Sequence, residues 1–168
     1  GIYVANYGGP TRFYEIENEL IKDKAKNLNL DNITGGRAVV SGHILTERAD
    51  IFAANERGAN FLFKNNNGKF DDVAFDYRLD DAIQNGRGTA LSDIYYRGRL
   101  DILSGNWLGY HRAWVLKNNE FKDIGNKDFD EPSRIRTIIS ADFDNDGFDE
   151  VFMNNIACLL YTSDAADE

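Results

Sequence analysis

The apolar residues of this chain fall in short runs that are separated by loops rich in glycine, asparagine and aspartate. The runs are rich in β-branched and aromatic residues, which favour strands over helices. In the middle of the chain they predict eight strands, near 37–42, 50–54, 60–64 and 69–75, and near 88–93, 101–105, 111–117 and 120–124. The best candidate for a helix is residues 14–27, where the spacing of apolar residues also fits a helical period.

These runs repeat with a period of about fifty residues, the scale of propeller blades. The repeat is anchored at Gly1, Asp50, Asp101 and Glu150, which are 49, 51 and 49 residues apart. An asparagine follows five residues after each anchor, at Asn6, Asn55, Asn106 and Asn155. After the first three anchors, a glycine, an apolar residue and an aspartate also recur, at Gly9, Gly58 and Gly109, at Ile21, Phe70 and Phe121, and at Asp23, Asp72 and Asp123.

Four antiparallel strands per repeat, joined by turns, are typical of one β-propeller blade. The sequence therefore predicts an all-β fold, a partial β-propeller of about three four-stranded antiparallel blades over residues 1–157. Its units are expected at about 1–25, 36–75, 87–125 and 134–157. Because residues 14–27 are in register with the repeat, we expect strands there and not a helix.

One loop carries the pattern of a calcium site. Asp142, Asp144 and Asp146 occupy alternate positions, Gly147 supplies a sharp turn, and Glu150 follows four residues after Asp146. Ca²⁺ takes six to eight oxygen ligands, and this spacing wraps carboxylates around one point. The ligand set predicted for Ca²⁺ is the side chains of Asp142, Asp144, Asp146 and Glu150 with the backbone carbonyl of Phe148.

The flanks of this loop exclude an EF-hand. An EF-hand needs a bidentate Glu at loop position twelve and helices on both sides. Position twelve is Met153, and the flanking residues 135–141 and 151–154 have the composition of strands. The alternative to a calcium loop is an acidic hairpin turn that holds no ion.

The corresponding loops of the other units lack this ligand set. The loop at 93–101 keeps Asp93 and Asp101 but has Tyr95 and Arg97 at ligand positions. We predict that the Arg97 guanidinium lies between the two carboxylates and replaces the ion; the alternative is that Arg97 points into solvent. In the loop at 42–50, only Thr46 and Asp50 offer ligand-type side chains at the matching positions.

Several long stretches resemble a known family, namely IYVANYGGP, GGRAVVSG, DIFAANERGANFLFKNNNGKF, LDILSGNWLGYHR and ADFDNDGFDEVFMNNIA. They are similar to the FG-GAP or VCBS-type repeats of integrin-α-like propellers, and closest to the cartilage acidic protein 1 / ASPIC-UnbV family. The resemblance covers residues 2–157. It implies a seven-bladed propeller, calcium in the loops of some blades, secretion, and adhesive or matrix roles.

The last residues, 158–168, do not follow the repeat. They read as the in-frame translation of a sequencing-library transposon adapter, and the alternative is a genuine C-terminal peptide. The single cysteine of the chain, Cys158, lies in this tail, so no disulfide framework is predicted. We expect the chain to be a fragment, and no signal peptide is visible in it.

Composition narrows the functional classes. The net charge of −9 argues against binding to nucleic acid or to an anionic membrane surface. No apolar run is long enough for a membrane span. The two histidines, His43 and His111, sit in different units without a metal-ligand spacing, so we expect them to be loop or packing residues. No nucleophile elbow, phosphate loop or metalloprotease motif is present.

Two functional interpretations remain. The first is a non-catalytic, calcium-binding extracellular or secreted propeller, periplasmic or on the cell surface if bacterial, that binds a protein or glycan partner. The alternative is the propeller portion of a secreted carbohydrate-active enzyme or lectin. The family resemblance favours the first.

Overall fold

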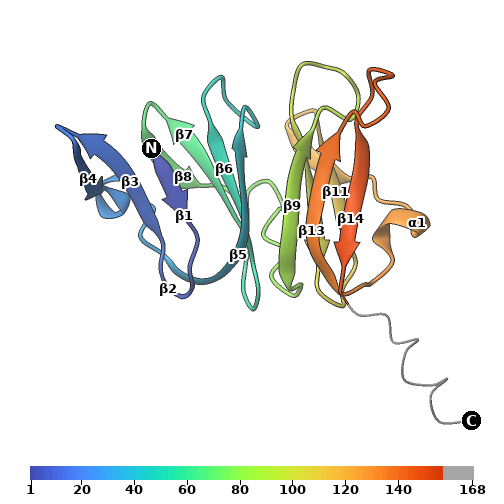
Figure 1. Ribbon diagram of the computed structural model, residues 1–168, viewed down its shortest axis with the longest axis horizontal. Coiled ribbons are helices and arrows are strands. Elements are labelled where there is room, and N and C mark those ends of the chain that lie inside the picture. Colours follow the sequence, from blue (N-terminus) through green and yellow to red (C-terminus); the bar gives the residue numbers. More distant parts are fainter. Residues whose placement is uncertain (157–168) are drawn as a thin grey trace, which may run out of the picture.

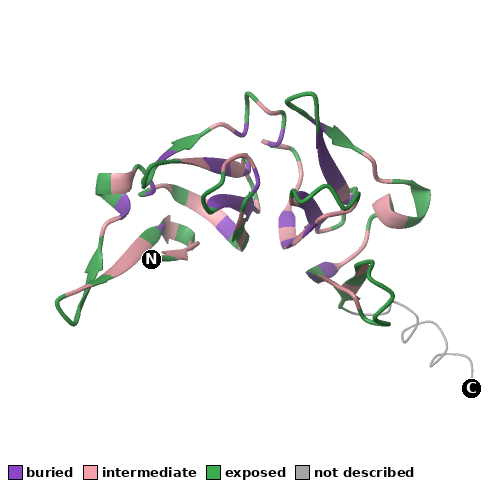
Figure 2. Ribbon diagram, turned by 90° about the horizontal axis from the view of Figure 1, so that it is seen from above, coloured by how far each residue is buried: buried purple, intermediate pink, exposed green. Residues whose placement is uncertain are grey.

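Four antiparallel sheets follow one another along the chain in the computed structural model, which describes residues 1–156 (Figure 1). The sheets stand side by side in an arc when seen from above (Figure 2). This arrangement confirms the predicted all-β, partial propeller fold. The predicted adapter segment at 158–168 lies outside the described residues.

The first sheet holds three strands, β1 (Ile2–Val4), β3 (Arg12–Glu17) and β4 (Leu20–Asp23). A short 3₁₀ helix, η1 (Ala25–Leu28), follows them. The segment with helical periodicity is therefore mainly strand, and β3 and β4 pair as an antiparallel hairpin, with Tyr14 opposite Asp23 and Glu17 opposite Leu20. The second sheet is built from β5 (Ile33–Gly42), β6 (Asp50–Asn55), β7 (Phe61–Asn66) and β8 (Lys69–Asp72).

The second sheet also gains a fifth strand, β2 (Tyr7–Pro10), which differs from the expected four. Strand β5 begins at Ile33, earlier than predicted, and its first residues present an unpaired edge. Strand β2 covers that edge, with Tyr7 opposite Gly35 and Pro10 opposite Ile33. Covering a free edge in this way satisfies its backbone donors and acceptors.

The third sheet has the four expected strands, β9 (Gly86–Ser92), β10 (Asp101–Asn106), β11 (Arg112–Lys117) and β12 (Glu120–Asp123). After the short helix α1 (Lys127–Asp130), the last sheet contains β13 (Ile135–Ala141) and β14 (Glu150–Asn155). Among residues 1–156, no helix is both long enough and apolar enough to cross a membrane.

The inner strands β5, β9 and β13 are neighbours across the sheets. The three strands run in the same direction, and each ends in a loop that leads to the next strand, β6, β10 or β14. These three loops therefore lie at one end of the molecule (Figure 1). The candidate calcium loop, residues 142–149, is one of them.

The cores lie between the sheets and not within them. The largest joins the second and third sheets, where Phe52 packs edge-on against Trp114 with 5.8 Å between ring centroids. Strands β6 and β10 are buried over their whole length because each has a neighbouring sheet on both faces. This stacking also explains the continuous apolar runs of the middle strands in place of alternation.

Candidate metal centre

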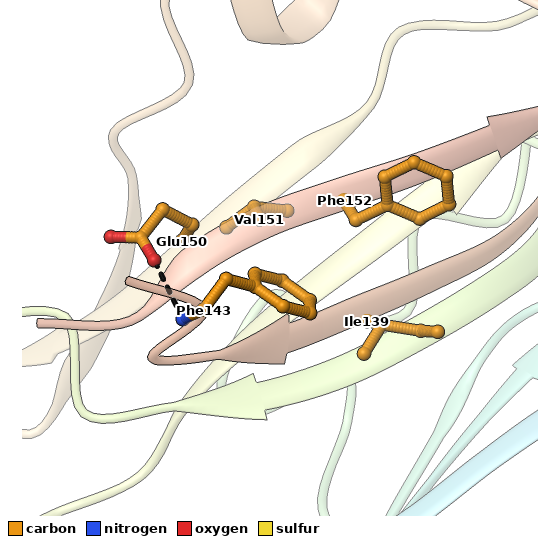
Figure 3. Close-up of a pocket in the computed structure, with 5 residues that line it drawn as sticks. All are labelled: Ile139, Phe143, Glu150, Val151 and Phe152. Atoms are coloured by element: carbon orange, nitrogen blue, oxygen red, sulfur yellow. Dashed lines mark hydrogen bonds between the residues drawn. The ribbon is translucent and has the colours of Figure 1, made fainter. Parts of the chain in front are cut away.

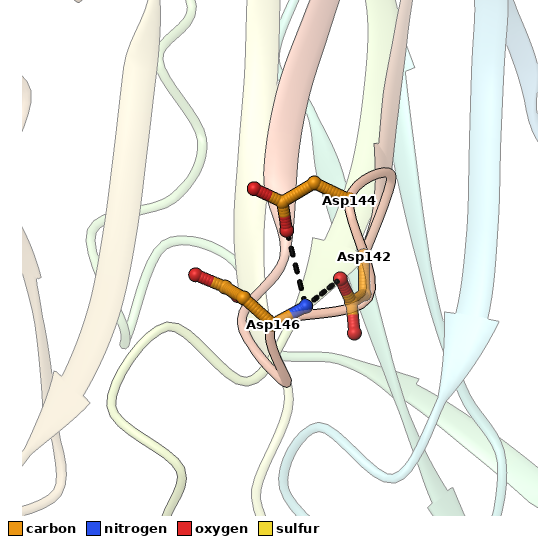
Figure 4. A group of neighbouring side chains, drawn as sticks. All are labelled: Asp142, Asp144 and Asp146. Carbon is orange, nitrogen blue, oxygen red and sulfur yellow. Dashed lines mark hydrogen bonds between the residues drawn. The ribbon is translucent and has the colours of Figure 1, made fainter.

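The candidate calcium loop joins β13 to β14, with Ala141 paired to Glu150 at its base. Three of the predicted ligands, Asp142, Asp144 and Asp146, gather at its tip, where one carboxylate oxygen of each lies within 4.8 Å of the others (Figure 4). All three side chains are exposed. Within residues 1–156 this is the one group of three or more acidic, histidine or cysteine side chains placed to hold a metal ion.

The backbone of the loop holds these carboxylates in place. Asp142 accepts hydrogen bonds from the amides of Asp146 (3.1 Å) and Gly147 (2.9 Å). Asp144 accepts from the Asp146 amide at 3.1 Å, and Asp146 accepts from the Phe148 amide at 2.8 Å. Because each carboxylate oxygen has two lone pairs, these contacts leave capacity for a cation. The turn needs positive φ at Asn145 (62°) and Gly147 (93°), which explains the Asn and Gly there.

Glu150 does not gather with the three aspartates. One of its carboxylate oxygens accepts a hydrogen bond from the Phe143 amide at 2.9 Å (Figure 3). Phe148, expected to offer its carbonyl, turns its ring edge-on to Tyr96, with 4.5 Å between centroids. The structure therefore brings together three of the five predicted ligands and places the other two at the base of the same loop.

The comparisons with known proteins agree with this architecture. A family model described as FG-GAP-like repeat matches residues 93–153, which include the loop. The chain is 42% identical to cartilage acidic protein 1 of Homo sapiens over 99% of its length, and 42% identical to that of Xenopus tropicalis over 92%. Residues 93–153 therefore belong to the FG-GAP-like repeat family. It spans 27–28% of the length of these relatives.

A second FG-GAP-like loop, residues 93–101, has the same turn without the same ligands. Asp93 accepts hydrogen bonds from the amides of Arg97 (2.8 Å) and Gly98 (2.5 Å), as Asp142 does from the amides at the matching positions. Tyr96 and Gly98 again have positive φ, at 53° and 69°. The loop at 93–101 thus has the same backbone conformation as the candidate calcium loop.

The side chain of Arg97 replaces the missing carboxylates in that loop. Its guanidinium lies 2.7 Å from Asp101, which is fully buried, and also donates to the Leu116 carbonyl at 2.8 Å. The predicted salt bridge is confirmed for Asp101, whereas Asp93 is met by backbone amides. Burial raises the pKa of Asp101, and the Arg97 charge opposes that shift.

The corresponding loop of the second sheet, residues 42–50, is closed by a single carboxylate. Asp50 is fully buried and accepts from the amides of Leu45 (2.7 Å), Thr46 (2.9 Å) and Asn65 (2.8 Å). The Thr46 hydroxyl donates to it at 3.0 Å. Asp50 therefore organises the backbone of a loop that has no other acidic residue at a ligand position.

The two neighbouring FG-GAP-like loops are docked to each other, a contact that the sequence does not reveal. The Tyr96 hydroxyl accepts from the Asp149 amide at 2.8 Å. The Asp149 side chain turns away from the triad and accepts from Ser92 (2.8 Å) and Ser140 (3.2 Å). Loss of hydration, with further contributions from nearby acidic groups, raises the pKa of the Tyr96 phenol. The loop of one blade thus supports the candidate calcium loop of the next.

The two histidines are not part of any such group. His43 is exposed in the loop after β5. His111 is buried, with Nδ1 accepting from the Asn106 amide at 3.0 Å and Nε2 2.9 Å from the Ser133 hydroxyl. Both placements confirm the expectation of loop and packing roles.

Proposed function

We propose that this chain is part of an extracellular or secreted β-propeller that binds Ca²⁺ through one loop and binds a protein or glycan partner without catalysing a reaction. The observation that carries the proposal is the gathering of three carboxylates in a hairpin turn that already fixes their positions. Similarity to cartilage acidic protein 1 supports the extracellular placement.

The residues of the loop fit calcium better than other metals. All the side chains on offer are hard oxygen donors, and Ca²⁺ prefers carboxylate, carbonyl and water oxygens. Asp142, Asp144 and Asp146 would supply the first ligands. Glu150, after a change of its side-chain conformation, and the Phe148 carbonyl would add to them. The ion would offset the repulsion among exposed carboxylates and fix the hairpin between β13 and β14.

A non-catalytic role rests on the placement of the polar side chains. His111 is held in the interior by Asn106 and Ser133, and Arg97 forms an ion pair with Asp101. These groups stabilise turns and blade contacts, as expected of a repeat module that presents surfaces to a partner.

Calorimetric titration with CaCl₂ tests the metal site, using the longest chain that carries residues 1–157. We expect one site with a Kd of about 10⁻⁴ to 10⁻³ M, the range of extracellular calcium modules. Asp144→Ala should weaken binding by about tenfold or more, because a charged ligand is lost while the neighbouring acidic groups stay.

The matched control is Asp149→Asn, which changes the charge of the same loop by the same amount. Its side chain faces Ser92 and Ser140, and an Asn oxygen can still accept those hydrogen bonds. We expect its calcium affinity to stay within about twofold of the parent. Equal calcium affinity in Asp144→Ala and the parent would refute the assignment.

A further inference from the structure

Each of the inner strands carries a β-bulge near its beginning, and the extra residue is an arginine each time. In β5 the pairs Gly36–Asn55 and Ala38–Ala54 leave out Arg37. In β9 and β13 the same shift leaves out Arg87 and Arg136. Bulges re-aim side chains and often lie beside functional sites. The arginines are 50 and 49 residues apart, so they occupy one position of the repeat.

The acceptors of these arginines also share one repeat position, the residue after the recurring asparagine. Arg37 lies 3.8 Å over the Tyr7 ring and 2.6 Å from the Glu56 carboxylate. Arg87 lies 2.9 Å from Glu56 and 4.9 Å from the centroid of Trp107. The guanidinium of the third arginine lies 5.0 Å from that same centroid. We call this continuous row the arginine ladder, in the order Tyr7, Arg37, Glu56, Arg87, Trp107, Arg136.

The three arginines of the ladder carry more positive charge than its one carboxylate can neutralise. Within residues 1–156, Glu56 is the one carboxylate that forms ion pairs with the ladder, and it pairs with two of the three guanidiniums, those of Arg37 and Arg87. The Arg87 side chain is 11% exposed, and its Nε is buried without a hydrogen-bond partner. Arg136 is exposed and forms no ion pair or side-chain hydrogen bond with the rest of the described chain. Spare donors therefore collect at the end formed by Arg87, Trp107 and Arg136.

We propose that Arg87 and Arg136, which both lie over the Trp107 ring, form a binding site for an oxyanion, either a carboxylate or a sulfate group. The guanidinium fork matches both groups, and charge-assisted hydrogen bonds of this kind are strong. The net charge of −9 disfavours the binding of long polyanions. A single anionic group bound at these arginines experiences less of that repulsion. The arginines are near the start of the inner strands, at the end opposite to the calcium loop, so this site is independent of the metal.

Trp107 provides a direct reporter of binding, because its ring contacts both guanidiniums. The other tryptophan, Trp114, is 5% exposed in the core and gives a constant background. The longest chain that carries residues 1–157 is titrated with sodium sulfate and, separately, sodium acetate, with NaCl of equal ionic strength as the reference. We expect a saturable change in emission with at least one of the two anions, and its loss in Trp107→Phe. The anion that binds more tightly identifies the group that the site selects.

Arg136→Gln should lower the affinity for the more tightly bound anion by about tenfold. Arg136→Lys keeps the charge but loses the guanidinium fork, so its affinity should lie between those of Arg136→Gln and the parent. The matched control is Arg99→Gln, an exposed arginine of the 93–101 loop at the opposite end of the inner strands. Thermal melting verifies that each variant is folded. The proposal is wrong if neither anion gives a saturable change in emission, or if Arg136→Gln and Arg99→Gln bind the anion with equal affinity. The arginine ladder would then only stabilise the contacts between blades.

Discussion

The recurring aspartates and asparagines bind backbone groups at the same place in each repeat. Asp23, Asp72 and Asp123 each accept a hydrogen bond from the amide two residues later, at 3.0, 3.1 and 3.0 Å. The side chains of Asn55 and Asn106 donate to the carbonyl four residues later, at 2.5 and 2.7 Å. Buried or turn-forming backbone groups need such partners. The repeat was visible in the sequence because these residues cannot be exchanged freely.

His111 occupies the position that Asn60 holds in the preceding blade. The Asn60 side chain accepts from the Asn55 amide at 3.0 Å, and His111 accepts from the Asn106 amide through Nδ1 at the same distance. Both side chains are buried. The imidazole can do this only in its neutral form, since a protonated Nδ1 is a donor.

This geometry predicts a loss of stability in acid. Burial lowers the pKa of His111 below its ordinary value of 6.5. Its contribution is therefore complete above about pH 6.5 and is lost as the pH falls through the folded-state pKa. The expected loss is about 1–3 kcal/mol, the cost of an unsatisfied buried donor. Melting temperatures between pH 7.5 and 5 measure it.

His111→Asn should remove this part of the pH dependence, because the asparagine of the neighbouring blade makes the same contact without titrating. His43→Asn is the control, since that histidine is exposed. A parallel acid slope in His111→Asn and the parent would show that other groups cause it.

At the scale of elements, the sequence predicts the strands well and their irregularities poorly. The eight central strands fall within a few residues of their predicted positions because turn residues bound each short apolar run. The bulges at Arg37, Arg87 and Arg136 were missed, since one extra residue hardly alters a short apolar run. Strand β2 was missed because its pairing depends on a free edge and not on its own composition.

The same limit applies to the candidate metal centre. The spacing of Asp142, Asp144 and Asp146 is local, so the sequence predicts their gathering. The contact of Glu150 with the Phe143 amide depends on the side-chain conformation of Glu150, which the spacing of residues in the sequence does not determine. The support from Tyr96 comes from another blade, about fifty residues earlier in the chain, and needs the stacking of two loops.

Close approach between blades predicts that Gly86→Ala is destabilising. A Cβ at Gly86 would lie 2.7 Å from the Ala54 Cβ and 3.2 Å from the Asn55 backbone nitrogen and oxygen. The backbone there cannot yield without moving β6 away from β9. We expect a loss of about 1–3 kcal/mol, typical of overpacking, measured by chemical denaturation.

Gly9→Ala is the matched control for this substitution. Its Cβ would meet only the Asn6 Cβ, at an ordinary 3.7 Å. We expect its stability to stay within about 0.5 kcal/mol of the parent. Similar losses in both variants would mean that glycine's backbone freedom, and not the fit between blades, decides the effect.

At the scale of the whole molecule, the stability of each blade depends on its neighbours. The three apolar clusters lie between consecutive sheets, and no sheet holds a core of its own within residues 1–156. The faces at the two ends of the arc are bare. Ile16 and Ile21 of the first sheet are 75% and 72% exposed, and Phe143 and Phe152 of the last are 57% and 56% exposed (Figure 3).

We therefore predict that residues 1–157, expressed alone, do not behave as a closed domain. Repeat units gain much of their stability from the interfaces with their neighbours, and exposed apolar sheet faces promote association. Size-exclusion chromatography with light scattering should show aggregates, or calorimetry a broad, non-cooperative transition. Calcium should sharpen only the part of the transition that belongs to β13 and β14, because the candidate ligands lie in that hairpin. The control is a longer chain that supplies neighbouring blades, which should melt in one transition. A monodisperse monomer of residues 1–157 with a single sharp, calcium-dependent transition would contradict the prediction, since the blades would then be stable with only part of the ring.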